Sequence, residues 1–468
     1  MESRKIVNKA VEVYIIATII YSFIGRVVPF KVFIGEELNT IMYYLLALVG
    51  GGLVAVDFFT TKEWRKGKYI GILYIFIAVM CISSVLNIEY GYIDNVKTII
   101  WTTIEIVLIY TLYKRYEKES FVKLMDKIWW GISVFWFFPV VYSLKQFALL
   151  ERYRVRLEGT RRVRQGFYEN RLFGIFNDPN FAAATSVYVI LACLYLYKKS
   201  DNKKLKIFLI IDIIVQMMYV VLSGSRTAIV CMIAVGCVWG WLQWHKKNTE
   251  WKIGKKILRF VAVPVFSAVI VALGSTAIQK ASIIMPMTYY YVVYGETLDE
   301  IEIEGEEIDD DLTTRKDGQG ENISNNRTTI WMAYLDGMEG DLLFGGSPRN
   351  NLVKWQEKDP DGYLVETEYE THNGYLLVLV STGVVGFSVL LVYVILYARK
   401  LWIYVKERKE LETEFVFVML VLITLLVYAF FFTEIFFIHN LTSVLFWMHL
   451  GASMFWIDHD QCEMKEIN

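Results

Sequence analysis

Residues 205–243 read LKIFLIIDIIVQMMYVVLSGSRTAIVCMIAVGCVWGWLQ, and this stretch decides the fold class. Two apolar runs, 205–222 and 227–243, flank the polar turn Ser-Gly-Ser-Arg at 223–226. A helix of about 20 predominantly apolar residues crosses the hydrocarbon core of a bilayer. The stretch therefore predicts two membrane-spanning helices joined by a turn of a few residues.

The composition of the whole chain agrees with this prediction. Its 468 residues are 55% hydrophobic and 21% charged, and the mean hydropathy is +0.38. Average globular chains contain about 45–50% apolar and about 25% charged residues. An ordinary soluble domain is therefore excluded, and we expect an all-α polytopic membrane protein with about twelve transmembrane helices. The predicted spans are 10–30, 40–59, 69–86, 98–113, 128–150, 180–197, 205–222, 227–243, 257–274, 374–396, 415–432 and 435–457.

The distribution of lysine and arginine predicts the orientation of these spans. Cations concentrate at the N-terminus and in the even-numbered short connections, whereas the odd-numbered short connections contain few. The cation-rich connections are 60–68, 114–127, 198–206, 244–256 and 397–414. Because short cytoplasmic loops carry an excess of lysine and arginine, both termini are expected to be cytoplasmic, in a multi-pass protein of the cytoplasmic (plasma) membrane.

The spans and loops divide the chain into five expected regions. They are an N-terminal five-span region at 1–150, a basic external loop at 151–179, spans six to nine at 180–274, a large external loop at 275–373, and spans ten to twelve with a cytoplasmic tail at 374–468. The large external loop, between spans nine and ten, contains an acidic insertion at 296–321. Its acidic core is either a hairpin or a solvated excursion. The aspartates at 309–311 lack the spacing of a recognised metal-binding loop, so we expect no metal.

The external loop 151–179 is rich in arginine, although external loops normally carry few cations. It contains seven arginines and four acidic residues, a net charge of +3. Alternation of arginine with apolar or aromatic residues, followed by a glycine turn, predicts a hairpin with one cationic face. Arginine binds phosphate or carboxylate in a bidentate manner; the alternative is a solvated hairpin that pairs with acidic groups elsewhere on the external face. The hairpin arginines are Arg152, Arg154, Arg156, Arg162 and Arg164.

Two polar residues lie at the predicted outer membrane boundary. His372 is the only histidine outside on this map, next to Asn373 at the mouth of span ten, and histidine is a common general base. Arg226, in the turn between spans seven and eight, is placed to bind a lipid phosphate head group, or else it snorkels to the interface. Inside the spans, Glu105 and Asp212 require packing partners or a polar cavity.

Four motifs between about residues 170 and 390 resemble the O-antigen polymerase and ligase superfamily, the Wzy-type polymerases and O-antigen ligase-like membrane proteins. The motifs are Arg171 with GIFNDPN at 174–180, Ser225-Arg226-Thr227, Arg327 with Trp331 and LFGG at 343–346, and HNGYL at 372–376 with Gly383 and Gly386. They occur in the family's order and all lie on the predicted external side. The third motif also has the spacing of a helix, because Arg327, Trp331 and Leu335 recur at every fourth residue after Asn326.

The resemblance implies a glycosyltransferase fold of the GT-C type and a corresponding activity. Members transfer a glycan from undecaprenyl pyrophosphate to an acceptor at the outer face of the cytoplasmic membrane, without a metal or other cofactor. The implied partners are an undecaprenyl-pyrophosphate-linked oligosaccharide, the lipid bilayer, and a flippase and chain-length regulator of the same pathway, with no nucleic acid.

Roles for single residues follow from the resemblance. Arg226 and Arg327 are expected to hold the pyrophosphate, and His372 is expected to deprotonate the acceptor hydroxyl, with inversion at the anomeric carbon. The expected substrate-binding residues are Arg171, Asn177, Asn180, Asn373 and the hairpin arginines Arg152, Arg154, Arg156, Arg162 and Arg164.

Several functions remain open on the sequence. We favour polymerisation of repeat units into a capsule, O-antigen or exopolysaccharide, because the chain contains no soluble domain suited to recognising a separate carrier. The alternatives are ligase-type transfer of the glycan to another acceptor and transport by a lipid-linked glycan flippase, since twelve spans with both ends inside is also a carrier architecture. A non-catalytic receptor or scaffold that uses the acidic loop is a third alternative.

Overall fold

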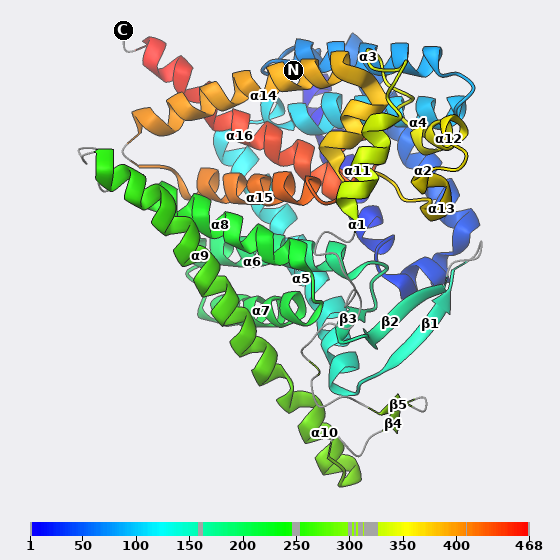
Figure 1. Ribbon diagram of the computed structural model, residues 1–468. Helices are drawn as coiled ribbons and strands as arrows, with labels where there is room; N and C mark the ends of the chain where they lie inside the picture. Colours follow the sequence, from blue (N-terminus) through cyan, green and yellow to red (C-terminus); the bar gives the residue numbers. More distant parts are fainter. Residues whose placement is uncertain are drawn as a thin grey trace. The chain divides into compact units, whose positions relative to one another are not determined.

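The structure is a computed structural model that describes residues 2–157, 162–245, 253–297, 302–303, 306–307, 312, 326–408 and 410–466. Over these residues the fold is mainly helical, with short strands in two small antiparallel sheets (Figure 1). The chain divides into two compact units. Unit 1 contains Met1–Ser22, Thr40–Phe121 and Asn322–Asn468, and unit 2 contains Phe23–Asn39 and Val122–Glu321.

Unit 1 is built from helices of both ends of the chain. Its N-terminal part contains most of α1 (Glu2–Ile24) and α2 (Val28–Phe59), the 3₁₀ turn η1 (Glu63–Arg65), α3 (Ile70–Leu86), α4 (Tyr92–Ile104), the π-helical turn η2 (Glu105–Ile109) and the 3₁₀ turn η3 (Tyr110–Arg115). Its C-terminal part contains α11 (Arg327–Asp336), α12 (Asn351–Lys358), α13 (Tyr363–Thr367), α14 (Gly374–Glu407), α15 (Thr413–Ala429) and α16 (Leu441–Glu466). Within this unit α15 packs along α16, and α14 packs against α3 (Figure 1).

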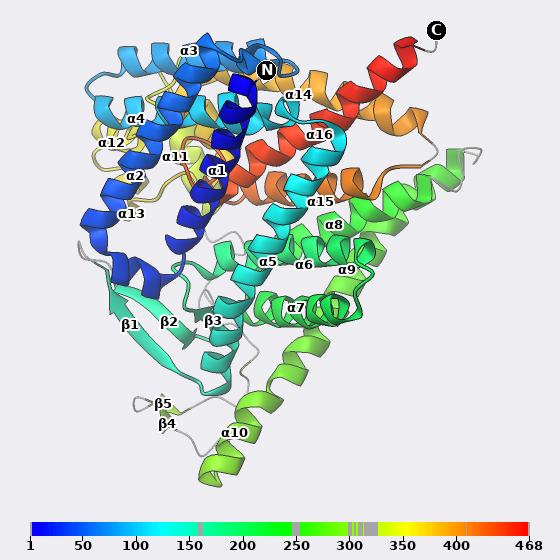
Figure 2. The ribbon, with the colours of Figure 1, turned by 180° about the vertical axis from the view of Figure 1, so that it is seen from behind.

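Unit 2 combines helices with the larger of the two sheets. Its helices are most of α5 (Lys118–Ala148), α6 (Pro179–Lys199), α7 (Lys203–Leu222), α8 (Arg226–His245), α9 (Ile253–Ser282) and α10 (Ile284–Tyr294). Its strands are β1 (Arg152–Arg156), β2 (Arg162–Tyr168), β3 (Arg171–Gly174), β4 (Glu302–Ile303) and β5 (Glu306–Glu307). Helix α6 packs against α7, and Figure 2 shows β1, β2 and β3 as one sheet that follows α5.

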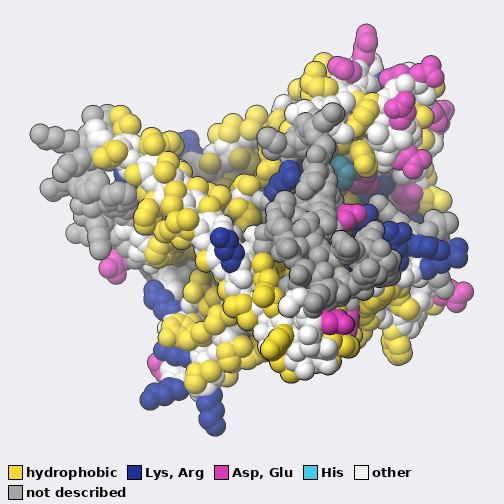
Figure 3. All heavy atoms as spheres, turned by 60° about the horizontal axis from the view of Figure 1, so that its bottom comes forward, with side chains coloured by type: hydrophobic (Ala, Val, Ile, Leu, Met, Phe, Trp, Pro, Cys, Tyr) yellow, Lys and Arg dark blue, Asp and Glu magenta, His cyan; other side chains and the backbone are white. Residues whose placement is uncertain are grey.

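A helix of the structure lies at each of the twelve predicted spans. Among the described residues, nine helical segments are long and apolar enough to cross a membrane, and α3 and α15 are shorter apolar helices. Many large apolar side chains are exposed, including Phe33, Leu48, Phe59 and Trp402, as expected for helices in contact with lipid. Figure 3 shows hydrophobic side chains over much of the face that it presents. The chain is therefore an all-α polytopic membrane protein.

Several span boundaries differ from the prediction, among them the start of α2 at Val28 rather than 40 and the end of α14 at Glu407 rather than 396. Helix α1 ends at Ile24 rather than near residue 30, because the proline at 29 lies in the first turn of a new helix, and Arg26 therefore lies in a connection. Span nine was expected to end at 274, but the apolar helical segment continues through α9 and α10 to Tyr294. Helix α16 begins at Leu441 rather than at 435, because Asn440 accepts the Ser443 N–H bond that caps this helix.

Glu105 and Asp212, the carboxylates singled out inside the predicted spans, have packing partners. Asp212 on α7 accepts hydrogen bonds from Gln216 Nε2 at 2.8 Å and from Cys193 Sγ at 3.2 Å. Glu105 Oε1 accepts a hydrogen bond from Ser443 Oγ at 2.7 Å and lies 3.0 Å from His439 Nδ1. Both residues therefore have packing partners, which is one of the two alternatives left open by the sequence.

The predicted arginine hairpin is present and is extended by a third strand. Strands β1 and β2 pair in antiparallel register, with Arg154 opposite Arg164 and Arg156 opposite Arg162. Strand β3 pairs with the other edge of β2. In the acidic insertion, β4 and β5 form a short antiparallel pair, whereas the aspartates at 309–311 lie outside the described residues.

A break in helix α14 joins it to the glycine turn at 342–346. Gly383 has φ 65°, and the helical hydrogen-bond pattern is interrupted there. Three backbone hydrogen bonds of 2.8–3.2 Å connect the turn to α14, from Gly346 to Val380, from Val384 to Leu342 and from Val385 to Leu343. At Gly345 (φ 74°) a Cβ atom would lie 2.5 Å from the Ser381 carbonyl carbon. Irregular backbone within a membrane protein is tolerated where protein satisfies its polar groups, so these glycines form one backbone junction.

Replacing Gly383 by alanine is expected to destabilise this junction. The left-handed conformation costs a non-glycine residue about 1–3 kcal/mol, and the new Cβ atom would collide with the Leu343 backbone. Purified Gly383→Ala should therefore have a lower apparent melting temperature in detergent than the wild type. Gly71→Ala in α3 is the matched control, because no atom lies within 4 Å of its added Cβ. Equal melting temperatures for both variants would contradict the junction.

Candidate functional site

Arg171 connects the first two motifs, both of which lie in unit 2. Its side chain is buried, with 5% of the residue exposed. Nε donates a hydrogen bond to Ser223 O at 2.9 Å, and Nη2 donates to Asn180 Oδ1 at 3.1 Å. Gly224 (φ 62°) is required beside it, since a Cβ atom there would lie 3.2 Å from Arg171 Cγ. Arg171 thus ties the start of α6 to the turn that carries Arg226, and its predicted contact with substrate stays a prediction.

The structure adds Arg26 to this group, a residue that the predicted span 10–30 concealed. Its guanidinium lies 4.0 Å from the ring centroid of Phe181 on α6, a cation–π contact. Its carbonyl accepts a hydrogen bond from Asn177 N–H at 3.2 Å. The Asn177 Oδ1 atom is buried and has no hydrogen-bond partner among the described residues. The sequence signal that could have identified Arg26 is the Gly25-Arg26 pair shortly before a proline, which indicates a turn.

Arg226 occupies the first position of α8 and is exposed. The N-terminus of a helix carries partial positive charge, which favours an anion and disfavours a cation. No acidic residue lies in the first turn of α8 to offset this charge. The helix end and the guanidinium therefore create a positive site that suits a phosphate group.

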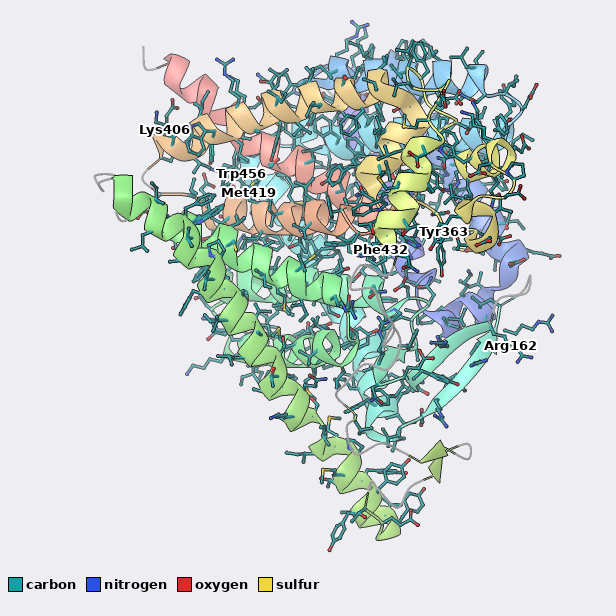
Figure 4. The ribbon with its side chains drawn as sticks, in the orientation of Figure 1. Arg162, Tyr363, Lys406, Met419, Phe432 and Trp456 are labelled. Atoms are coloured by element: carbon teal, nitrogen blue, oxygen red, sulfur yellow. The ribbon has the colours of Figure 1, made fainter. Side chains whose placement is uncertain are left out.

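The hairpin arginines gather on one face of the sheet. The direct pairs Arg154–Arg164 and Arg156–Arg162 place four guanidinium groups on the same side of β1 and β2. Like charges directly opposite each other destabilise a sheet, so this face favours an anion. Arg164 also forms an ion pair with Glu169 at 2.6 Å. Figure 4 shows Arg162 extending outward from the sheet.

In unit 1, Arg327 occupies the first position of α11, again with no acidic residue in the first turn. Its guanidinium lies 5.3 Å and 5.7 Å from the ring centroids of Phe431 and Phe432, in the connection between α15 and α16. Figure 4 shows Phe432 near the beginning of α11. The same argument about the helix dipole applies as for Arg226, so this end of α11 also suits an anion.

His372 and Asn373 lie at the start of α14 in the same unit. His372 is half-buried and has φ 46°, a left-handed conformation that is uncommon for residues other than glycine. Asn373 caps α14, because its Oδ1 accepts hydrogen bonds from Tyr375 N–H at 2.9 Å and Leu376 N–H at 3.0 Å. Asn373 therefore has a structural role, and a contact of its side chain with substrate stays a prediction.

The connection 430–440 brings the Arg327 and His372 segments together. Trp331 on α11 stacks edge-on against Phe430 at 5.5 Å, and its Nε1 donates a hydrogen bond to Thr371 O at 2.9 Å. Thr433 Oγ1 donates to Glu370 at 3.3 Å. The sequence prediction assigned most of this connection to spans eleven and twelve, because phenylalanine and isoleucine predominate there. The predicted residues thus form two groups, one in each unit.

Helices α11, α12 and α13 form a lobe, and ion pairs of Asp341 stabilise it. Asp341 lies 2.6 Å from Lys354 Nζ and 2.7 Å from Lys358 Nζ. Burial alone would raise the pKa of the Asp341 carboxyl, but hydrogen bonds from the two lysines lower its pKa overall. The carboxylate therefore stays ionised at neutral pH and connects α12 to the turn after α11.

Comparison with known families identifies one region of the chain. Residues 207–391 match a family model described as O-antigen ligase. This region contains Arg226, Arg327, His372 and Asn373, whereas Arg171 and the hairpin precede it. A comparison with curated proteins gives no match. Residues 207–391 are therefore similar to the O-antigen ligase family, which supports the resemblance to the O-antigen polymerase and ligase superfamily.

Proposed function

We propose that the protein polymerises undecaprenyl-pyrophosphate-linked repeat units into a cell-surface polysaccharide at the outer face of the cytoplasmic membrane. The family supports a polysaccharide polymerase or ligase role for a glycosyltransferase-like membrane enzyme. The observation that carries the proposal is the position of Arg226 and Arg327. Each stands at the first residue of a helix, inside the matched region, where the helix dipole already favours an anion.

The proposed reaction is an inverting transfer without a metal. The acceptor hydroxyl oxygen forms a bond to the anomeric carbon, and the bond from that carbon to the pyrophosphate oxygen breaks. His372 accepts the hydroxyl proton, and undecaprenyl pyrophosphate leaves with the bonding electrons. Arg226 and Arg327 stabilise the negative charge that develops on the leaving phosphates, an effect that is large where water is excluded. Arg171, Asn177, Asn180 and the cationic hairpin contribute to donor binding.

Ligase-type transfer to a different carrier is the second candidate, because the matched family is described as O-antigen ligase. Incubation of purified protein with one lipid-linked repeat unit separates the two reactions. A ladder of products is expected for a polymerase. Product that forms only when a second acceptor is added would identify a ligase. Movement of labelled substrate across vesicles without elongation would identify a flippase and contradict both. Arg226→Ala and Arg327→Ala should each lose the ladder in this assay.

A further inference from the structure

The lobe of α11, α12 and α13 contains a cavity that the proposed reaction does not use. Its volume is about 600 Å³, and all its lining residues belong to unit 1. Helix α13 packs against both α11 and α12, and Figure 1 shows the three helices grouped together. Pockets of about 300–1,000 Å³ are typical of small-molecule sites. A short oligosaccharide fits this range.

The cavity lies on the side of α11 opposite Arg327. Successive residues of a helix are separated by about 100° around its axis. Thr329, Met332, Ala333 and Asp336 form the face that lines the cavity. Arg327 is therefore on the far side of a helix about 10 Å in diameter. A ligand in this cavity would not touch Arg327.

Aromatic rings and glycines form the wall of the cavity. Trp355 and Tyr363 line it, and Figure 4 labels Tyr363 on α13. The Trp355 indole is fixed, because its Nε1 donates a hydrogen bond to Tyr334 O at 2.7 Å. Gly337 lies directly against this indole, so close that a Cβ atom would collide with it. Trp355 is only 2% exposed and forms the closed floor of the cavity. Tyr363 is half-buried and supplies the aromatic surface that suits the C–H face of a sugar ring.

The charged groups of the cavity are mostly carboxylates. Asp336, Glu339 and Asp359 line it, and none of them forms an ion pair among the described residues. Lys358 also lines it, but its Nζ is already bound to Asp341 at 2.7 Å and to the Gly337 carbonyl at 2.9 Å. The cavity therefore offers charged hydrogen-bond acceptors and repels anions.

We propose that this cavity is a glycan-binding subsite for a sugar that carries hydroxyl or ammonium groups and no acidic group. The carboxylates accept hydrogen bonds from those groups, and Tyr363 packs against the ring. This inference rests on the proposed function. The subsite holds a part of the growing glycan that is remote from the bond being made. Phosphate or uronic acid groups are excluded by charge. Its chemistry is thus opposite to that of the arginine-rich ends of α8 and α11.

Soluble sugars test the subsite without the lipid carrier. The probes are a glucosamine trimer, an N-acetylglucosamine trimer and a galacturonic acid trimer, titrated into purified protein and followed by saturation-transfer NMR. The amine-bearing trimer should bind most tightly, the neutral trimer more weakly, and the acidic trimer should not bind. Equal binding of the acidic trimer, or binding of none of the three, would overturn the proposal.

Matched variants locate the binding. The triple variant Asp336→Asn, Glu339→Gln and Asp359→Asn should weaken binding of the amine-bearing trimer by at least about tenfold, because charged hydrogen bonds are lost. Asp336→Lys should reverse the preference toward the acidic trimer. Glu366→Gln, an exposed carboxylate of α13 outside the cavity, should change nothing. Unchanged affinity in the triple variant would place the binding elsewhere.

The outcome is separable from that of the proposed function. In the transfer assay the triple variant should raise KM for the acceptor with little change in kcat, as expected for binding remote from the chemistry. Sugar binding in a protein that never elongates a glycan would support the subsite and contradict the polymerase. Elongation with an unchanged KM for the acceptor in the triple variant would support the polymerase and contradict the subsite.

Discussion

Replacing His372 by asparagine is expected to lower the rate of glycan transfer by about 10²- to 10⁴-fold, the usual contribution of a general base. Asparagine adopts a left-handed φ more readily than most residues, so the φ of 46° at this position is retained. The imidazole that would accept the hydroxyl proton is lost, whereas the Asn373 cap of α14 is unaffected. The variant should therefore fold and bind substrate but transfer slowly.

Steady-state kinetics with a lipid-linked repeat unit measure this effect. The decrease should lie in kcat, with KM close to that of the wild type. Glu368→Asn is the matched control, because Glu368 is exposed, lies in the same loop and also has a positive φ, 53°. This control should keep full activity. Wild-type kcat in His372→Asn would exclude the residue from the chemical step.

The second large effect is expected at the buried pair of Glu105 and His439. Both side chains are almost fully buried, with 3% and 1% exposed, and the imidazole stacks on Trp101 with ring centroids 3.6 Å apart. Leaving a buried polar group without its hydrogen-bond partner costs about 1–3 kcal/mol. Glu105→Ala should therefore strongly lower the apparent melting temperature in detergent. It should also reduce activity, because His439 belongs to the connection that contacts Arg327 through Phe431.

A double replacement tests whether the loss of stability comes from breaking the Glu105–His439 pair or from any substitution in this helical segment. Glu105→Leu with His439→Phe removes both polar partners and keeps an aromatic ring on Trp101. Well-packed apolar replacements of buried pairs are often neutral, so much of the stability should return. Glu407→Ala, at an exposed carboxylate in the last turn of α14, is the control and should have a small effect. A double variant as unstable as Glu105→Ala would contradict the pairing.

The sequence predicted the elements better than their ends. All twelve predicted spans coincide with helices because long apolar runs have few alternatives in a membrane. The boundary near Arg26 was wrong because its apolar neighbours conceal a turn. The predicted start of α16 was wrong for the same reason, since the connection 430–440 is almost as apolar as a span.

The sequence predicted single residues of the candidate site but not the contacts between them. Arg226, Arg327 and His372 were found from the family's motifs, and all three lie in the matched region. Arg26 and Phe431 were missed because neither belongs to a motif, and their relevance depends on contacts between distant segments. Asn373, a predicted ligand, caps α14 in the structure, so a residue of a motif can serve folding, and its contact with substrate stays a prediction.

The apolar runs and the polar turn at 223–226 determined by themselves that this chain is a helical membrane protein, because the cost of burying unpaired backbone in lipid leaves only helices for such runs. The tertiary structure decided which polar groups meet. Glu105 pairs with His439, and Arg171 donates a hydrogen bond to the turn before Arg226. Gly345 packs against the break at Gly383, and a carboxylate-lined cavity lies beside α11. These contacts join residues far apart in the chain, and local patterns carry no information about which distant partner satisfies a buried polar group.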